Sequence, residues 1–210
     1  MDKNFSETAH LFAPKPTYAL NAGYGGKSKT MGENHPDGAI INYYLESTDT
    51  STTTYTLTFK NAKGEVVRTF SSKAKNKKNL WIPKDGASRF VWNLETEGVD
   101  DVEGMINWWV LESGPKALAG NYTVEMQIGE ETFTAPLEIL KDPRLSASDA
   151  DLQAQYDFVL SIRDKMNEIN KTITSIRKVR GQLQTLEKNS EDNELKTEMT
   201  SLIDKMTNIE

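Results

Sequence analysis

The side chains best suited to acid–base and metal chemistry are sparse in this 210-residue chain. It contains no cysteine and only two histidines, His10 and His35. Neither histidine has a second histidine at a metal-ligand spacing, and thiolate sites are excluded because the chain has no thiol. We therefore expect no metal site, no bound cofactor and no histidine-based catalysis.

Neighbouring carboxylates are the remaining candidates for catalysis, because glycoside hydrolysis needs two of them held about 5–10 Å apart. Two groups stand close in the sequence: Glu33 with Asp37, and Asp100 with Asp101 and Glu103. A chain with 31 acidic residues contains such neighbours by chance, so we interpret both groups as solvated loop charges. The glycine-rich segment 23–28 lacks the GxxxxGK(S/T) spacing of a phosphate-binding loop. The sequence therefore predicts no catalytic residue.

The four tryptophans are better candidates for an interaction surface. Trp108 and Trp109 are adjacent in an expected strand, so alternation sends one ring to each face of the sheet. The ring outside the core is either covered by a neighbouring domain or exposed for stacking on a sugar, and we favour the domain contact. Trp92 alternates with apolar neighbours and is expected in the core. Trp81 is either a loop plug or an exposed contact.

The length, charge and hydrophobicity of the chain exclude some classes of protein. A length of 210 residues allows one or two domains. The formal net charge of -6 argues against nucleic-acid binding, which needs a basic surface. No segment reaches the ~20 apolar residues of a membrane span. The polar start, Met1 to Asn4, lacks the apolar stretch of a signal peptide. We therefore expect a cytoplasmic protein or an internal piece of a longer chain.

The sequence changes character near residues 141–144. Before this point lie 12 of the 13 glycines, 6 of the 7 prolines and all 4 tryptophans. This part contains short alternating segments rich in β-branched and aromatic residues, separated by turns. The expected strands are 38–46, 54–61, 65–70, 89–94, 105–111, 122–128 and 132–140. We predict an antiparallel β-sandwich for residues 1–141, with 1–35 as an entry segment.

Residues 142–210 show the periodicity of helices. Ser146 and Ser148 are alternative N-caps, each with an acidic residue three positions on. A first helix over about 148–187 carries an apolar seam with 3-4 spacing, formed by Val159, Ile162, Met166, Ile169, Ile173 and Ile176. A second helix carries Leu195, Met199, Leu202, Met206 and Ile209. We predict an antiparallel helical hairpin and, for the whole chain, the α+β class.

The two expected helices differ in length, which leaves part of the seam without a partner. At 1.5 Å per residue the first spans ~60 Å, and the second, of ~17 residues, only ~25 Å. The uncovered side chains must pack on the sandwich, on another chain or on something absent: Leu152, Tyr156, Val159, Ile162 and Met166. We predict an interaction surface from aromatic and apolar side chains: Trp81, Trp108, Trp109, Tyr156, Val159, Ile162 and Met166.

Several motifs recur in order in a known type of sandwich. They are GEVVRTF at 64–70, SRFVWNL at 88–94, Gly114-Pro115, and AGNYTV at 119–124. Together they resemble a bacterial immunoglobulin-like domain of the flagellar-hook-capping type, with Ala119 in place of the usual proline and Ala87-Ser88 in place of Leu-Asn. The resemblance implies an immunoglobulin/fibronectin-III-like sandwich, in which the Gly-x-Tyr turn anchors a corner.

A second set of motifs spans most of residues 10–145. They are HLFAPKPTY at 10–18, PDGAIINYYL at 36–45 and KDPR at 141–144. This set is similar to the region that follows the propeller in large bacterial proteins with sortilin-like, sialidase-repeat β-propellers, commonly labelled glycosyl hydrolases. The resemblance implies a C-terminal fragment of an exported, extracytoplasmic protein. The helical tail is similar to the tail of that family only in being helical, without matching motifs. No catalytic residue transfers, because any hydrolytic site belongs to the absent propeller.

Three functions follow as alternatives. The leading one is a non-catalytic accessory module that packs on the propeller of the same parent chain and mediates domain or subunit contacts, including a homodimer through the hairpin. The second is a carbohydrate-binding module that uses exposed aromatic side chains. The third is a glycoside hydrolase in its own right. None of the three involves a nucleic acid, a membrane span or a cofactor.

Overall fold

The computed structural model describes residues 8–20, 30, 36–105 and 113–210. Within them it has a mixed α+β structure of eight strands, a short 3-10 helix and two α-helices. The chain forms two compact units, Met1–Glu97 with Ser113–Asp157, and Gly98–Glu112 with Phe158–Glu210. This division falls inside the first helix, whereas the predicted boundary at residues 141 and 142 lies at the end of the last strand.

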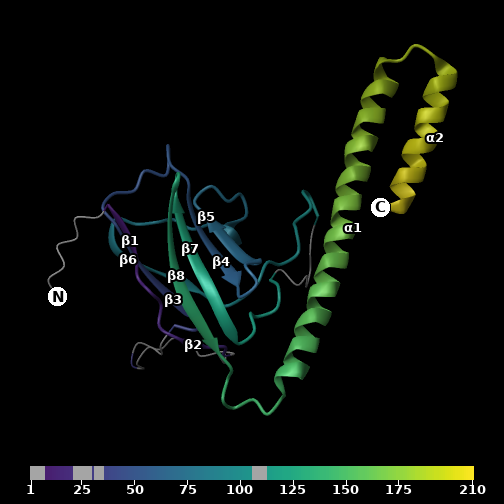
Figure 1. Cartoon of the computed structure of the whole chain (residues 1–210). Coiled ribbons are helices and arrows are strands. Elements are labelled where there is room, and N and C mark those ends of the chain that lie inside the picture. The colour runs from purple at the N-terminus through teal and green to yellow at the C-terminus, as the bar shows by residue number, and fades with distance from the viewer. Residues whose placement is uncertain (1–7, 21–29, 31–35, 106–112) are drawn as a thin grey trace. The chain divides into compact units, whose positions relative to one another are not determined.

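The first unit contains two sheets (Figure 1). The smaller sheet has the order β1-β3-β6, with bounds Ala9–Leu11, Ala39–Leu45 and Gly86–Trp92. The larger has the order β2-β8-β7-β4-β5, with bounds Thr17–Tyr18, Glu131–Leu140, Gly120–Ile128, Tyr55–Asn61 and Val66–Ser71. Neighbouring strands are antiparallel except β2 and β8, which are parallel. The 3-10 helix, Lys77–Asn79, follows β5.

The longer strands lie where alternation predicted them, with β6 starting at Gly86 rather than at residue 89. Strands β1 and β2 were not predicted, because segments of three and two residues are too short to show alternation. They become strands by pairing, β1 with β3 and β2 with β8. Of the predicted strand 105–111, only Met105 is among the described residues, and it lies outside any strand.

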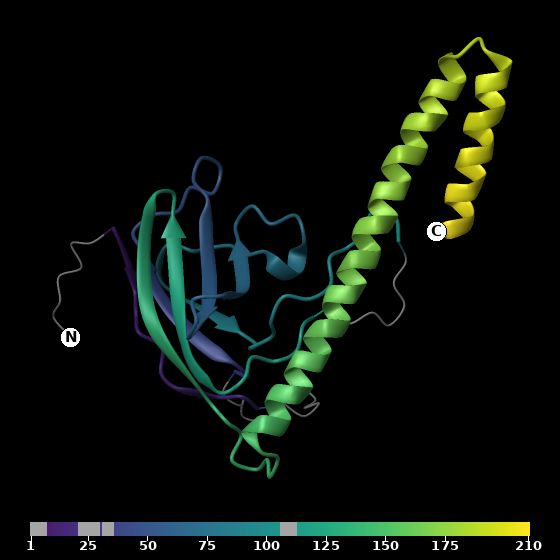
Figure 2. The ribbon, with the colours of Figure 1, turned by 45° about the vertical axis from the view of Figure 1, so that its right-hand side comes forward.

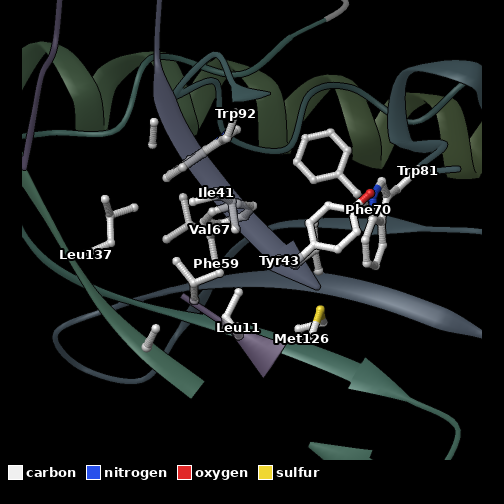
Figure 3. Close-up of a cluster of buried hydrophobic side chains, with 14 of the residues drawn as sticks. Leu11, Ile41, Tyr43, Phe59, Val67, Phe70, Trp81, Trp92, Met126 and Leu137 are labelled. Atoms are coloured by element: carbon white, nitrogen blue, oxygen red, sulfur yellow. The ribbon is translucent and has the colours of Figure 1, made fainter. Parts of the chain in front are cut away.

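The core takes side chains from both sheets (Figure 3). Phe59 of β4 stacks on Trp92 of β6, with ring centroids 4.2 Å apart. Trp92 is completely buried, as its alternating neighbours predicted, and its indole N–H donates to the carbonyl of Glu95 at 2.9 Å. The contact between Phe59 and Trp92 therefore joins the two sheets through apolar burial, with the one polar atom of the indole satisfied.

Trp81 belongs to the same core. Its side chain is 3% exposed and lies edge-on to Tyr43 at 5.4 Å and to Tyr55 at 6.5 Å between ring centroids. The backbone N–H of Trp81 donates to the carbonyl of Ser71 at 3.1 Å, which ties its loop to the end of β5. Of the two alternatives that the sequence left open, the structure has the loop plug. Trp81 is therefore not part of an exposed surface.

The turn that follows β8 is built on Asp142, which is buried. Its carboxylate accepts hydrogen bonds from Arg144, at 2.9 Å from the backbone N–H, 2.9 Å from Nε and 2.7 Å from Nη2. The hydrogen bonds from the Arg144 side chain are the main cause that lowers the pKa of Asp142 to about 2. The KDPR motif thus forms a turn held by a bidentate ion pair.

We expect Asp142→Asn to lower the free energy of unfolding at neutral pH, with a loss that disappears in acid. The pKa of Asp142 is lower in the folded chain, at about 2, than its ordinary 3.8. Its ionisation therefore stabilises the fold above about pH 4, and this contribution is lost as the pH falls through about 2. Urea unfolding of both proteins along this pH range measures the difference. A difference that is constant with pH would contradict the assignment.

Candidate interaction surface

The first helix, α1 (Asp149–Asn189), begins at a capping box. The N–H of Asp151 donates to Ser148 Oγ at 3.2 Å, and the Asp151 carboxylate accepts from the N–H of Ser148 at 3.2 Å. Of the two N-caps that the sequence left open, the structure uses Ser148. The reciprocal bonds satisfy N–H groups that have no partner within the helix, so the start of α1 is fixed by local sequence.

The second helix, α2 (Asn193–Ile209), folds back along the C-terminal part of α1 (Figures 1 and 2). Asp192 caps its start, and its carboxylate accepts from the N–H groups of Glu194 at 2.9 Å and Leu195 at 3.2 Å. The helix has 17 residues against the 41 of α1. It therefore covers only part of the longer helix, as the lengths predicted from the sequence required.

Polar contacts hold α2 against α1. The carboxylate of Glu210 pairs with Arg177 at 2.6 Å and with Arg180 at 2.9 Å. The hydrogen bond from Arg177 is the largest of the effects that lower the pKa of Glu210. Farther along, Thr200 Oγ1 donates to the carboxylate of Glu187 at 2.6 Å. These contacts fix which side of each helix faces the other.

Residues 98–105 also lie against α1, through contacts that were not predicted. The side-chain amide of Asn170 donates to the carbonyl of Asp100 at 2.6 Å. The N–H of Asp100 donates to Asn167 Oδ1 at 2.7 Å. Asn170 is buried. Asn167 and Asn170 stand three residues apart, which is the spacing of apolar seam positions. A buried amide needs a polar partner from outside its own helix, so this pair was the available sequence signal for a segment packed on α1.

An apolar stripe remains exposed on both helices, and we call it the hairpin stripe. On α1 its side chains are exposed by 65, 36, 51, 41 and 59% for Phe158, Ile162, Ile169, Val179 and Leu186. On α2 they are exposed by 46, 46 and 73% for Leu195, Leu202 and Ile209. The members on α2 recur at every seventh residue, as do Ile162 with Ile169 and Val179 with Leu186. This spacing is typical of a seam that packs against another helix.

The parts of the hairpin stripe on the two helices lie on the same side. Leu186 immediately precedes Glu187, which contacts α2, and Ile209 immediately precedes Glu210, which contacts α1. One residue corresponds to a rotation of about 100°. The two helices run antiparallel. Moving back by one residue along either helix therefore rotates the side-chain direction toward the same side of the helix pair. At this end of the hairpin the exposed side chains of α1 and α2 therefore lie on one side. Along α1 the stripe continues in one heptad register, with Phe158, Val179 and Leu186 at one seam position and Ile162 and Ile169 at the other.

The predicted surface residues are only partly brought together. Ile162 lies in the hairpin stripe, while Tyr156, Val159 and Met166 are half-buried on the adjoining side of α1. Trp81 lies in the core, and Trp108 and Trp109 lie outside the described residues. Phe158 was missed, although its place four residues before Ile162 was a visible signal.

Among the predicted surface residues on α1, Tyr156 interacts with the sheet unit. Burial raises the pKa of Tyr122 to about 12, and the electrostatic effect of Tyr156 adds to this shift. The hydroxyl of Tyr122 donates to the carbonyl of Leu118 at 2.8 Å. The first turns of α1 thus belong with the sheets, in agreement with the unit boundary after Asp157.

Two of the acidic residues considered for catalysis make structural contacts, one through its carboxylate and one through its backbone carbonyl. The carboxylate of Asp37 lies 3.4 Å from Lys116 Nζ, and the carbonyl of Glu103 accepts from Arg177 at 2.6 Å. Glu33 and His35 lie outside the described residues. Across the part of the chain that the structure describes, no three His, Asp or Glu side chains gather closely enough to hold a metal ion.

An open hollow of about 590 Å³ lies over the outward side of the smaller sheet, lined by Phe12, Asn42, Tyr43, Ala87, Ser88 and Arg89. Of its two aromatic lining residues, Tyr43 is buried in the core, and Phe12 packs against His10 with a centroid distance of 4.6 Å and an angle of 68° between the planes. Sugar-binding sheets offer flat aromatic faces for stacking. The edge-on pair of His10 and Phe12 does not form such a face.

Neither α1 nor α2 carries a stretch that is long and apolar enough to cross a bilayer, in a search restricted to the described residues. Comparisons of the chain with models of protein families, with curated proteins and with solved structures gave no match. The surface is therefore interpreted from its own residues.

Proposed function

We propose that this chain is a non-catalytic interaction module, in which an immunoglobulin-like β-sandwich carries a helical hairpin that binds another protein surface. The observation that carries the proposal is the hairpin stripe, in which eight large apolar side chains are exposed in one heptad pattern. Contiguous exposed apolar surface on a folded protein marks an interaction site far more often than scattered exposed residues do.

The immunoglobulin-like assignment is supported by the two sheets and their shared core. A further support is the hydrogen bond from the hydroxyl of Tyr122 to the carbonyl of Leu118, four residues upstream. A tyrosine that closes such a corner at the start of a strand is a hallmark of immunoglobulin-type sandwiches. Tyr122 is also the tyrosine of the AGNYTV motif on which the resemblance rests.

The parent context is proposed from the resemblance alone. The module is the C-terminal part of an extracytoplasmic bacterial protein with a β-propeller, on which it packs. Any glycosidase activity then belongs to the propeller. Of the acidic residues considered for catalysis, Asp37 forms an ion pair with Lys116 through its carboxylate, and the 98–105 segment contacts α1 through the backbone carbonyls of Asp100 and Glu103.

The proposal is tested by photocrosslinking in cells that make the protein naturally. A benzophenone amino acid at position 158 is expected to give a discrete crosslinked product of defined mass, because Phe158 is the most exposed member of the stripe on α1. The matched control places the same probe at Lys178, which is exposed on the opposite side of α1. Equal labelling from both positions, or no product from position 158, would reject an interaction through the stripe.

A further inference from the structure

We infer that the partner of the hairpin stripe is a second copy of this chain, bound antiparallel along α1. This inference rests on the proposed function, since it names the partner of the same surface. Three observations carry it: the extent of the stripe, the distribution of charge along α1, and the pairing that both allow around a two-fold axis.

The stripe has the shape that a second α1 requires. Toward the N-terminus of α1, beyond the reach of α2, it consists of Phe158, Ile162 and Ile169. Toward the C-terminus, Val179 and Leu186 stand beside the exposed side chains of α2. A partner helix must be as long as α1 to cover both the N-terminal and the C-terminal part of the stripe. A helix as short as α2 would cover only one of these parts. Among the described residues, α1 is the one helix of this length.

The charges of α1 are segregated along its length. Its first half contains the basic residues Arg163 and Lys165 among the acidic residues Asp149, Asp151, Asp157, Asp164 and Glu168. Its second half contains the acidic residue Glu187 among the basic residues Lys171, Arg177, Lys178, Arg180 and Lys188. Antiparallel copies place the acidic half of one helix along the basic half of the other. Parallel copies place like charges together, which is unfavourable.

A two-fold axis near Lys171 satisfies the apolar spacing as well. Ile162 then lies opposite Val179 of the second copy, and Phe158 lies opposite Leu183 of the second copy, a half-buried residue beside the stripe. The interface is isologous, so each contact is made twice. Asn170, which holds the 98–105 segment, is turned by about 100° from Ile169, and this segment therefore leaves the stripe uncovered.

The oligomeric state of the whole chain tests the inference first. Light scattering is expected to give twice the 23.6 kDa of the monomer at high concentration, falling toward the monomer on dilution. Ile169→Glu is expected to weaken the dimer by about 100-fold, because it places a charge at a central interface position twice. Ile82→Glu changes an even more exposed apolar residue of the sheet unit and should leave the dimer intact. A monomer at every concentration would overturn the inference.

Engineered cysteines determine the direction of the helices, and the absence of native cysteine makes their crosslinks unambiguous. A disulfide requires Cα atoms within about 7 Å. In the antiparallel dimer, a mixture of Ile162→Cys and Val179→Cys chains forms a mixed disulfide, while either variant alone does not crosslink. Efficient self-crosslinking of Ile162→Cys would show a parallel dimer and would overturn the inference.

The two experiments separate the inference from the proposed function. A monomeric chain that still gives a crosslinked product with a different protein from position 158 refutes the second copy and retains the interaction surface. A monomeric chain that gives no product refutes both. Helical circular dichroism that is unchanged in Ile169→Glu confirms that the variant is folded, because Ile169 is exposed in the single chain.

Discussion

Trp92→Ala is expected to lower the free energy of unfolding of the sheet unit by about 4 kcal/mol. The substitution removes the largest fully buried side chain of the core. It also removes the stacked contact with Phe59 and the hydrogen bond to the carbonyl of Glu95. The cavity between the two sheets cannot close, because the strands on either side are fixed by their pairing. The loss therefore includes both burial and cavity terms.

Urea unfolding, followed by tryptophan fluorescence to which Trp81 of the same core contributes, measures this loss. Ile82→Ala is the matched control, because Ile82 is 66% exposed, and it should change the stability by less than about 0.5 kcal/mol. If Trp92→Ala and Ile82→Ala had similar effects, the two sheets would not share the core described here.

Gly38→Ala is expected to cost about 3 kcal/mol, through backbone geometry rather than through lost contacts. Gly38 has a φ of +123°, a conformation that side chains oppose. A Cβ atom at this position would lie 2.1 Å from the carbonyl oxygen of Trp92, so the start of β3 would have to move away from the end of β6. The strain therefore affects the pair of strands that carries Trp92.

The control for this prediction is Gly64→Ala. Gly64 also has a positive φ, of +80°, but no atom lies within 4 Å of the position that its Cβ would take. This variant should show the conformational cost alone, of about 1 kcal/mol. Thermal unfolding of the two variants side by side separates strain from collision. Equal losses would mean that the close approach of Gly38 to the carbonyl of Trp92 is relieved without cost.

Most of the elements of this protein follow from short segments of its sequence. The strands from β3 to β8 followed from alternation, and α1 and α2 followed from 3-4 spacing. The unequal helix lengths were also visible, and the capping box was narrowed to Ser146 or Ser148, of which the structure uses Ser148. These features depend on residues only a few positions apart, so their physical causes are contained within the segment itself.

Other elements and contacts were decided only by the tertiary structure. β1 and β2 exist because neighbouring strands offer them edges. Trp81 is buried because the end of β5 holds its loop, and Asn170 is buried because residues 98–105 reach it. Each of these depends on a partner that is distant in the sequence.

The candidate surface combines both kinds of information. Periodicity showed that α1 has more apolar positions than α2 can cover. It did not show which of them stay exposed, because α2, the 98–105 segment and the hairpin stripe occupy different sides of one helix. Exposure is a property of all the neighbours together, so only the folded chain could distinguish Phe158 and Ile169 from the half-buried Val159 and Met166.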